Sequence, residues 1–183
     1  MKNRNVAVLL TLVATAFASL SFAQNPMVGG HDMSPMKNIV QNAVNSDDHT
    51  TLVAAVKAAG LVDTLSGTGP FTVFAPTNEA FAKLPAGTVD SLLKPENKDQ
   101  LKKVLTYHVV AGRLTSNDLR KKIEAGHGMA ELTTVEGGKL EAMMQGGGNI
   151  VLKDEKGGTA TVTIANVMQS NGVILVVDSV LLP

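Results

Sequence analysis

The stretch GPFTVFAPTNEAF, residues 69–81, combines the signals for a strand, a break and a helix. Residues 71–74 are aromatic or β-branched, which is typical of a β-strand. Pro76 has no backbone N–H and therefore ends the strand. Thr77 or Asn78 then provides a side-chain oxygen that can accept a hydrogen bond from a free N–H group at the start of a helix. We therefore predict a strand that is followed directly by a capped helix.

Further helices are predicted on both sides of this stretch. Leu52 to Ala59 place apolar residues at helical spacing, with Asp47 or Asp48 as the N-cap and Gly60 at the end. Two later segments have one apolar and one polar face, as expected for helices that pack on a core. These segments cover residues 97–105 and 117–125.

The last third of the chain changes to strand patterns. Apolar and polar residues alternate in three segments separated by glycine-rich turns, which predicts an antiparallel meander. The three segments are residues 139–144, 150–152 and 159–164. After a turn at Asn171-Gly172, Val173 to Val177 is nearly all apolar, which predicts a buried strand. Antiparallel strands packed with helices mainly from the first half give an α+β fold in one domain.

The N-terminal segment has the features of a secretory signal peptide. Lys2 and Arg4 precede a charge-free apolar stretch, residues 6–20, and Ala23 fits the signal peptidase site. The apolar stretch is shorter than the roughly 20 residues that a membrane-spanning helix needs. Three parts are therefore predicted: a signal peptide at residues 1–23, a flexible Met/His/Gly/Pro spacer at 24–35, and a folded domain at 36–183.

Composition and charge narrow the function. Lys and Arg total 16, as do Asp and Glu, and aromatic residues make up only 3%. No strong field attracts nucleic acid or an anionic membrane, so neither is expected as a partner, and no membrane insertion is expected after signal cleavage. The absence of cysteine excludes disulfides and thiolate metal sites. The signal peptide predicts export, to the periplasm or the extracellular space.

Three segments together resemble the fasciclin domain family. They are residues 69–81, residues 101–112 around Tyr107-His108, and residues 171–183 from Asn171-Gly172 onward. Their order and spacing also match, and the resemblance covers roughly residues 34–183. It implies a compact wedge of antiparallel β-strands packed with a cluster of helices. It also implies a secreted or surface-anchored protein that acts in cell adhesion or matrix interaction without catalysis, and the chain looks like a single-domain, secreted member of bacterial type.

Within these segments, several residues are expected to maintain the fold as core aromatics, breaks, caps and turns. They are Phe74, Pro76, Thr77, Asn78, Phe81, Asn171, Gly172 and Asp178. Asp178 follows the predicted buried strand, where an aspartate usually accepts hydrogen bonds from backbone N–H groups and fixes a turn. Because it has no partner carboxylate in the pattern, it is not interpreted as half of an acid–base pair.

Tyr107 and His108 are the candidate partner-binding residues. In animal members of the family, this segment is linked to integrin recognition together with flanking aliphatic residues, here Leu105, Val109 and Val110. The alternative is that both rings belong to the core. On a short strand the two rings would point to opposite faces. We therefore expect Tyr107 to be buried and His108 to lie nearer the surface.

No catalytic motif is recognisable, so neither an enzyme activity nor a cofactor is predicted. The histidines are not spaced as metal ligands, and no G-x-S-x-G or phosphate-binding loop is present. The histidines of the chain are His31, His49, His108 and His127.

The leading hypothesis is a secreted or periplasmic, non-catalytic module that binds a protein or polysaccharide at a cell surface or matrix. An alternative is an exported protein that binds copper or a small ligand through the spacer. Its candidate ligands are Met27, His31, Met33 and Met36, since thioether and imidazole groups suit copper. A third hypothesis is a hydrolase that acts outside the cytoplasm.

Overall fold

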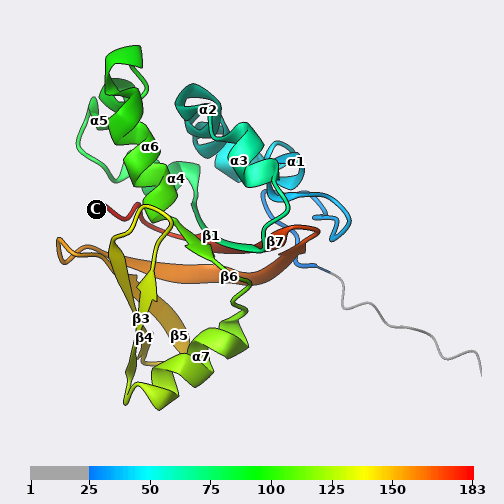
Figure 1. Cartoon of the computed structure of the whole chain (residues 1–183), viewed down its shortest axis with the longest axis vertical. Coiled ribbons are helices and arrows are strands. Elements are labelled where there is room, and N and C mark those ends of the chain that lie inside the picture. The colour runs from blue at the N-terminus through cyan, green and yellow to red at the C-terminus, as the bar shows by residue number, and fades with distance from the viewer. Residues whose placement is uncertain (1–24) are drawn as a thin grey trace, which may run out of the picture.

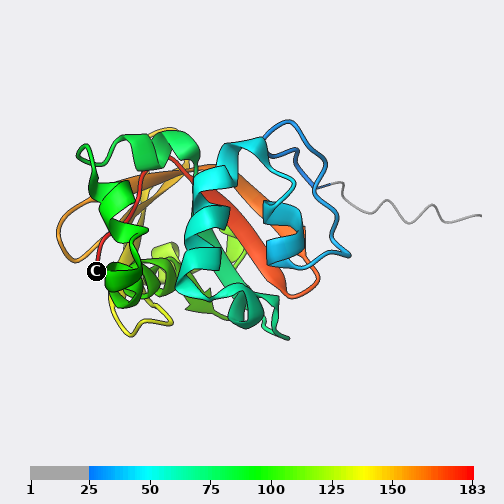
Figure 2. The same ribbon diagram turned by 90° about the horizontal axis from the view of Figure 1, so that it is seen from above.

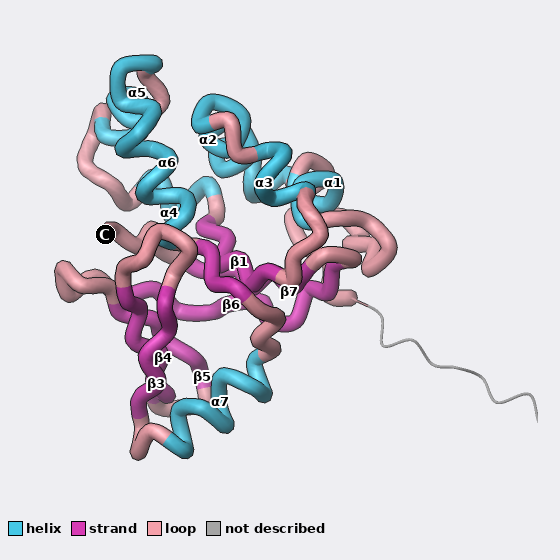
Figure 3. Tube along the Cα trace, viewed as in Figure 1, coloured by secondary structure: helices cyan, strands magenta, loops and turns pink. Residues whose placement is uncertain are grey.

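A computed structural model describes residues 25–183 of the chain, and in this part a seven-stranded sheet is packed with helices (Figures 1 and 3). The predicted signal peptide, residues 1–23, lies outside the described residues. The strands are β1 (Phe71–Pro76), β2 (Val109–Ala111), β3 (Met129–Thr133), β4 (Lys139–Gln145), β5 (Asn149–Lys153), β6 (Thr159–Gln169) and β7 (Gly172–Val177). The helices are α1 (Ile39–Ala43), α2 (Thr50–Ala59), α3 (Val62–Ser66), α4 (Asn78–Ala82), α5 (Thr88–Leu92), α6 (Lys98–Tyr107) and α7 (Ser116–Ala125), with 3₁₀ turns η1 (Asp47–His49) and η2 (Pro95–Asn97).

The strand order is β2-β1-β7-β6-β5-β4-β3, so the predicted meander forms one half of the sheet. Within the described sheet, neighbouring strands are antiparallel except for β1 and β7, which run parallel. The two edge strands also approach each other. Val110 of β2 forms a β-bridge with Thr134, and the N–H of Val135 donates to the carbonyl of Val109 at 2.7 Å. The sheet is therefore curled, and parts of both edges are paired, which reduces the exposed backbone of each edge.

Two apolar cores lie on opposite sides of β1 and β7. Helices α1 to α6 cover one side, and α7 packs with β3 to β5 on the other (Figures 1 and 2). Successive side chains of β7 alternate between these cores: Ile174 belongs to the helical core and Leu175 to the core that contains α7. Every residue of β7 is buried. The apolar run at residues 173–177 is explained by this burial on both faces.

Local signals placed most helix boundaries correctly. Gly60 ends α2 in the left-handed conformation at φ 70°, where glycine is favoured. The Thr77 side chain accepts a hydrogen bond from the N–H of Ala80 at 3.3 Å, which confirms Thr77 as the cap of α4. The prediction of an aspartate cap on the helix from residue 52 is wrong. Asp47 instead begins the 3₁₀ turn η1, and α2 starts after it with no side-chain cap.

Asn78 does not cap α4 but joins two segments. Its side-chain oxygen accepts from the N–H of Thr51 at 3.0 Å, and its Nδ2 donates to the carbonyl of Asp47 at 2.9 Å. The amide therefore ties the start of α4 to the segment from η1 to α2. A single asparagine can make both bonds because its amide group contains a donor and an acceptor.

The described residues 25–35 differ from the flexible spacer that the sequence predicted. Asn25 is buried, and its side chain donates to the carbonyls of Met33 and Met168 while accepting from the N–H of Met168. The side chains of Val28 and Met33 belong to the helical core. The segment has no apolar periodicity because it forms no long helix or strand, yet it is held to the domain by these contacts.

Asn171, at the turn between β6 and β7, connects three segments that lie far apart in the sequence. Its Nδ2 donates to the carbonyls of Leu65 and Gly67, both at 2.8 Å. Its Oδ1 accepts from the N–H of Ile39 at 3.0 Å. One buried side chain thus joins the first turn of α1 and the end of α3 to the sheet.

Replacing Asn171 with alanine is expected to lower the free energy of unfolding by about 2 kcal/mol, because three backbone groups lose their partner. Urea unfolding at constant pH measures the change. The matched control is Asn149→Ala at the exposed first residue of β5, where a change below about 0.5 kcal/mol is expected. Equal stability of the two variants would contradict the role assigned to Asn171.

Candidate partner-binding site

The segment from Tyr107 to Val110 begins at a helix end rather than on a strand. Tyr107 is the last residue of α6, His108 is its C-cap, and β2 starts at Val109. Tyr107 is 0% exposed and His108 is 2% exposed. The expectation that His108 lies nearer the surface is therefore wrong. Side chains of adjacent residues alternate between faces only in a strand, and this pair precedes the strand.

Tyr107 joins α6 to the β-sheet. Its hydroxyl donates to the carbonyl of Lys139 at 2.6 Å and accepts from the N–H of Glu155 at 3.2 Å. Its ring packs against Gly138, where an added Cβ would lie 2.7 Å from a ring carbon. Burial raises the pKa of the phenol. The tyrosine thus fills the core with its ring and connects two strand ends with its hydroxyl.

His108 uses both of its ring nitrogens inside the fold. Nδ1 lies 2.8 Å from the carbonyl of Val104, and Nε2 lies 3.0 Å from the N–H of Leu181. Nδ1 must carry the proton, since it faces a carbonyl while Nε2 accepts from an N–H. Burial lowers the pKa to about 4, although the Val104 carbonyl and the charge of Asp154 act in the opposite direction. The ring is therefore neutral at pH 7.

The aliphatic neighbours of this pair are buried as well, since Leu105, Val109 and Val110 are each 4% or 5% exposed. Tyr107 and His108 therefore do not form a contact surface with them. All five residues lie behind the surface, and they are divided between the two cores: Leu105 and Val109 belong to the helical core, Tyr107 and Val110 to the core that contains α7. Any partner would meet the residues that this group positions.

Between α5, α6 and the segment that follows β7 the surface is hollowed, and neither Tyr107 nor His108 is among the lining residues. The hollow has a volume of ≈ 530 Å³. Its lining includes the apolar residues Leu92, Leu182 and Pro183 and the charged residues Asp99, Lys103 and Lys156. The N–H of Leu181 donates to Nε2 of His108, and this bond holds the chain in place directly before Leu182. The C-terminal segment ends close to α6 in both ribbon views (Figures 1 and 2).

Asp154 is a further positioning residue, and the sequence analysis missed it. Its Oδ2 accepts from the N–H of Leu182 at 3.0 Å, and its Oδ1 accepts from the N–H groups of Lys156 and Gly158. The carboxylate therefore fixes two walls of the hollow at once. The available signal was an aspartate at the start of a glycine-containing turn, a position where it often bonds to the backbone.

The other predicted motif residues have structural roles. Phe74 and Phe81 are buried in the two cores. Asp178 accepts from the N–H of Thr161 at 2.8 Å, which confirms its predicted role as a backbone acceptor. Gly172 faces the carbonyl oxygen of Phe71 so closely that a Cβ would clash with it. Pro76 is the last residue of β1, as its missing N–H predicts.

The candidate copper ligands of the N-terminal segment are differently placed. Met33 is buried in the helical core, whereas Met27 and Met36 are exposed. His31 pairs with Asp47, with 3.3 Å between Nε2 and Oδ2. A site that used Met33 with Met36 would need one ligand from the core and one from the surface. Residues 25–183 hold no group of three or more His, Cys, Asp or Glu side chains arranged to bind a metal ion.

No helix in the described part of the chain combines the length and the apolar character required to cross a membrane.

Comparison with known proteins agrees with this architecture. The family model for the fasciclin domain matches residues 47–183. A solved structure of a FAS1 domain pair from the insect cell adhesion molecule fasciclin I superimposes with a TM-score of 0.70 at 21% identity. That match covers 80% of this chain and 51% of the other, so this chain spans about half of the domain pair. The fold is thus that of a FAS1 domain.

Proteins from bacteria and animals are similar to this chain in sequence. Protein sll1483 of Synechocystis is 52% identical over 79% of this chain and 73% of its own length. The immunogenic protein MPB70 of Mycobacterium bovis is 31% identical over 100% of this chain and 99% of its own. The transforming growth factor-beta-induced protein ig-h3 of Sus scrofa is 34% identical over 82% of this chain but only 20% of its own length. The chain belongs to the fasciclin domain family.

Proposed function

We propose that the protein is an exported, non-catalytic interaction module that binds a protein or polysaccharide at a cell surface or in a matrix. The observation that carries the proposal is the hollow next to the C-terminal segment that His108 bonds, whose lining combines apolar residues with two lysines. Membership of the fasciclin family supports it, as does the likeness to an insect cell adhesion molecule. The signal peptide predicted at residues 1–23 supports export.

The chemistry of the hollow fits a partner that has both apolar and acidic or hydroxyl groups. Leu182 and Pro183 offer an apolar wall, while the ammonium groups of the two lining lysines can bind carboxylates or hydroxyls. Asp99 is the acidic residue of the lining, so the charged lining side chains carry one net positive charge. Neither lysine is buried. The Lys103 ammonium lies 3.5 Å from Oε1 of Glu136, so a partner's carboxylate would compete with this ion pair, whereas Lys156 is in no such pair among the described residues. The buried pair behind the hollow holds these walls in place without contacting the partner.

The test compares adhesion of host cells to surfaces coated with the parent protein and with the double variant Lys103→Gln/Lys156→Gln. We expect cell retention to fall about fivefold, because two charge-assisted contacts at the rim are lost. The control is Lys121→Gln/Lys122→Gln on α7, on the far side of the sheet, which changes the net charge equally (Figure 1). Equal retention by both variants would exclude the hollow as the binding site. No retention by the parent would contradict adhesion itself.

A further inference from the structure

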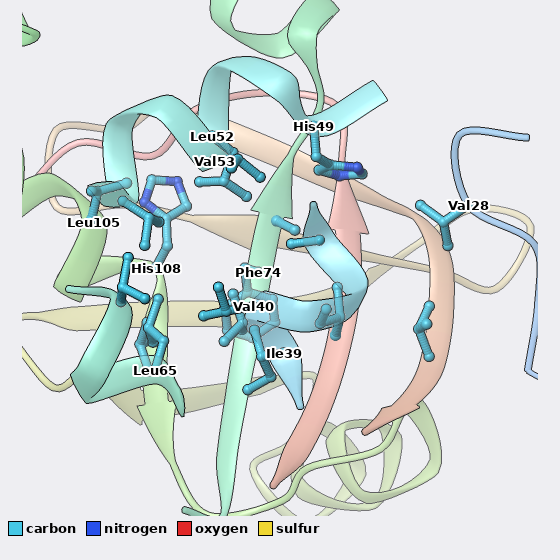
Figure 4. Close-up of a pocket in the computed structure, with 18 of the residues that line it drawn as sticks. Val28, Ile39, Val40, His49, Leu52, Val53, Leu65, Phe74, Leu105 and His108 are labelled. Atoms are coloured by element: carbon cyan, nitrogen blue, oxygen red, sulfur yellow. The ribbon is translucent and has the colours of Figure 1, made fainter. Parts of the chain in front are cut away.

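A second site lies between the helices and the sheet. There, α1, α2 and α3 enclose an apolar cavity of ≈ 50 Å³ against β1 and β7 (Figure 4). Its walls include Ile39, Leu52, Leu65, Val73 and Ile174. The cavity is distinct from the hollow at α5 and α6, with which it shares no lining residue.

One polar side chain in this apolar wall has an unused hydrogen-bonding atom. His49 is 3% exposed, and its Nδ1 lies 2.8 Å from the hydroxyl oxygen of Ser46. Its Nε2 is buried and has no hydrogen-bond partner among the described residues. The carbonyl of Ala75 is near enough to favour the charged ring but forms no hydrogen bond with it. Buried polar atoms without a partner are rare and often indicate a missing ligand or water.

The second histidine of the wall gives a useful contrast. His108 also lines the cavity, on the opposite side of Leu52 and Val53 from His49 (Figure 4). Both of its nitrogens are already bonded within the protein. Of the two rings, only His49 can therefore offer an atom to a bound molecule.

The geometry points to a site for a neutral, straight-chain aliphatic alcohol whose hydroxyl pairs with Nε2 of His49. A hydroxyl both donates and accepts, so it suits either tautomer of the ring. A carboxylate paired with His49 would bring a charge into an apolar cavity, since burial lowers the pKa of His49 and favours the neutral ring. Lys57, the other basic side chain of the lining apart from the two histidines, is exposed.

The size of the cavity selects a slender ligand. It is smaller than the roughly 150 Å³ cavity that accommodates a benzene ring. The hydroxyl and first carbons would lie inside. The half-buried residues Val40 and Val53 mark where the wall reaches the surface at α1 and α2, and the rest of the chain would leave there.

The test titrates 1-hexanol, with hexane as the matched ligand, into the protein, followed by calorimetry and by the ¹⁵N resonances of the histidine rings. We expect saturable binding of 1-hexanol and a shift of the His49 Nε2 resonance, with His108 unchanged. Hexane is expected to bind about five- to tenfold more weakly, because it cannot form the hydrogen bond.

Two variants distinguish the contribution of the His49 hydrogen bond to affinity from that of the cavity volume. His49→Phe should reduce the affinity for 1-hexanol to that for hexane, whereas Val53→Phe should prevent binding of both by filling the half-open side. No saturable binding would mean that the cavity holds water at most, and would overturn the proposal. Equal affinity for the two ligands, or an unshifted His49 resonance, would also overturn it. None of these outcomes depends on whether the protein mediates adhesion.

Discussion

Replacing Tyr107 with alanine is expected to lower the free energy of unfolding by about 4 kcal/mol, among the largest effects of any single substitution in this domain. The ring is fully buried, so its removal leaves a cavity next to Gly138. The substitution also leaves the carbonyl of Lys139 and the N–H of Glu155 without their partner. Urea unfolding, with the linear dependence of the free energy on denaturant, measures the loss.

Tyr107→Phe is the matched variant, because it keeps the ring and removes only the hydroxyl. We expect it to cost about 2 kcal/mol, since two hydrogen bonds are lost but the packing is kept. Faster hydrogen exchange at the N–H of Glu155 should accompany this loss. A cost below about 1 kcal/mol for Tyr107→Ala would show that the ring does not support the core.

The second large effect is a loss of stability in acid that arises from His108. Burial lowers its folded-state pKa to about 4, whereas an unfolded histidine has its ordinary value of about 6.5. Between these values the unfolded chain binds more protons, so stability rises with pH and falls as the pH is lowered from 6.5 to 4. At about 1.36 kcal/mol per unit, we expect a loss of about 3 kcal/mol from this group over that range.

His108→Gln separates this contribution from other titrating groups. It removes the titration while keeping an amide that can both donate and accept. The decline in unfolding free energy between pH 7 and pH 4 should be about 3 kcal/mol smaller than in the parent protein. His127→Asn is the control for removing a histidine at an exposed position, outside both cores. If His108→Gln declines as steeply as the parent, His108 is not the group responsible.

The stability of the Tyr107 and His108 variants also affects how a loss of adhesion in these variants is interpreted. Both side chains are buried and bonded to distant backbone groups. Loss of adhesion in Tyr107 or His108 variants would therefore follow from a disturbed domain or a displaced C-terminal wall. Surface variants at Lys103 and Lys156 are the more direct test of contact, because they leave the core intact.

The sequence was sufficient where structure depends on neighbours within a few residues. Thr77 bonds three residues ahead of itself, and Gly60 ends α2 through its own backbone conformation. The glycine-rich turns and alternating residues likewise predicted the β4–β5–β6 meander, which needs only short connections. The apolar run at residues 173–177 predicted a strand buried on both faces, because no side chain in it could face water at low cost.

Other features depended on partners that a local pattern cannot reveal. Residues 25–35 show no periodicity, and two of the three hydrogen bonds of the buried Asn25 side chain go to the distant Met168. The cavity at His49 exists because helices from one part of the chain pack over strands from another.

By itself, then, the sequence determined the α+β fold, the family signature and most helix and strand positions. These follow from backbone propensity and from which residues avoid water. The tertiary structure alone decided that His108 points inward as well as Tyr107, and that Asn78 joins two segments instead of capping α4. His108 bonds Leu181, 73 residues along the chain. Such long-range hydrogen bonds and packing contacts decide whether a side chain points into the core or toward solvent. The residues that neighbour it in the sequence do not predict them.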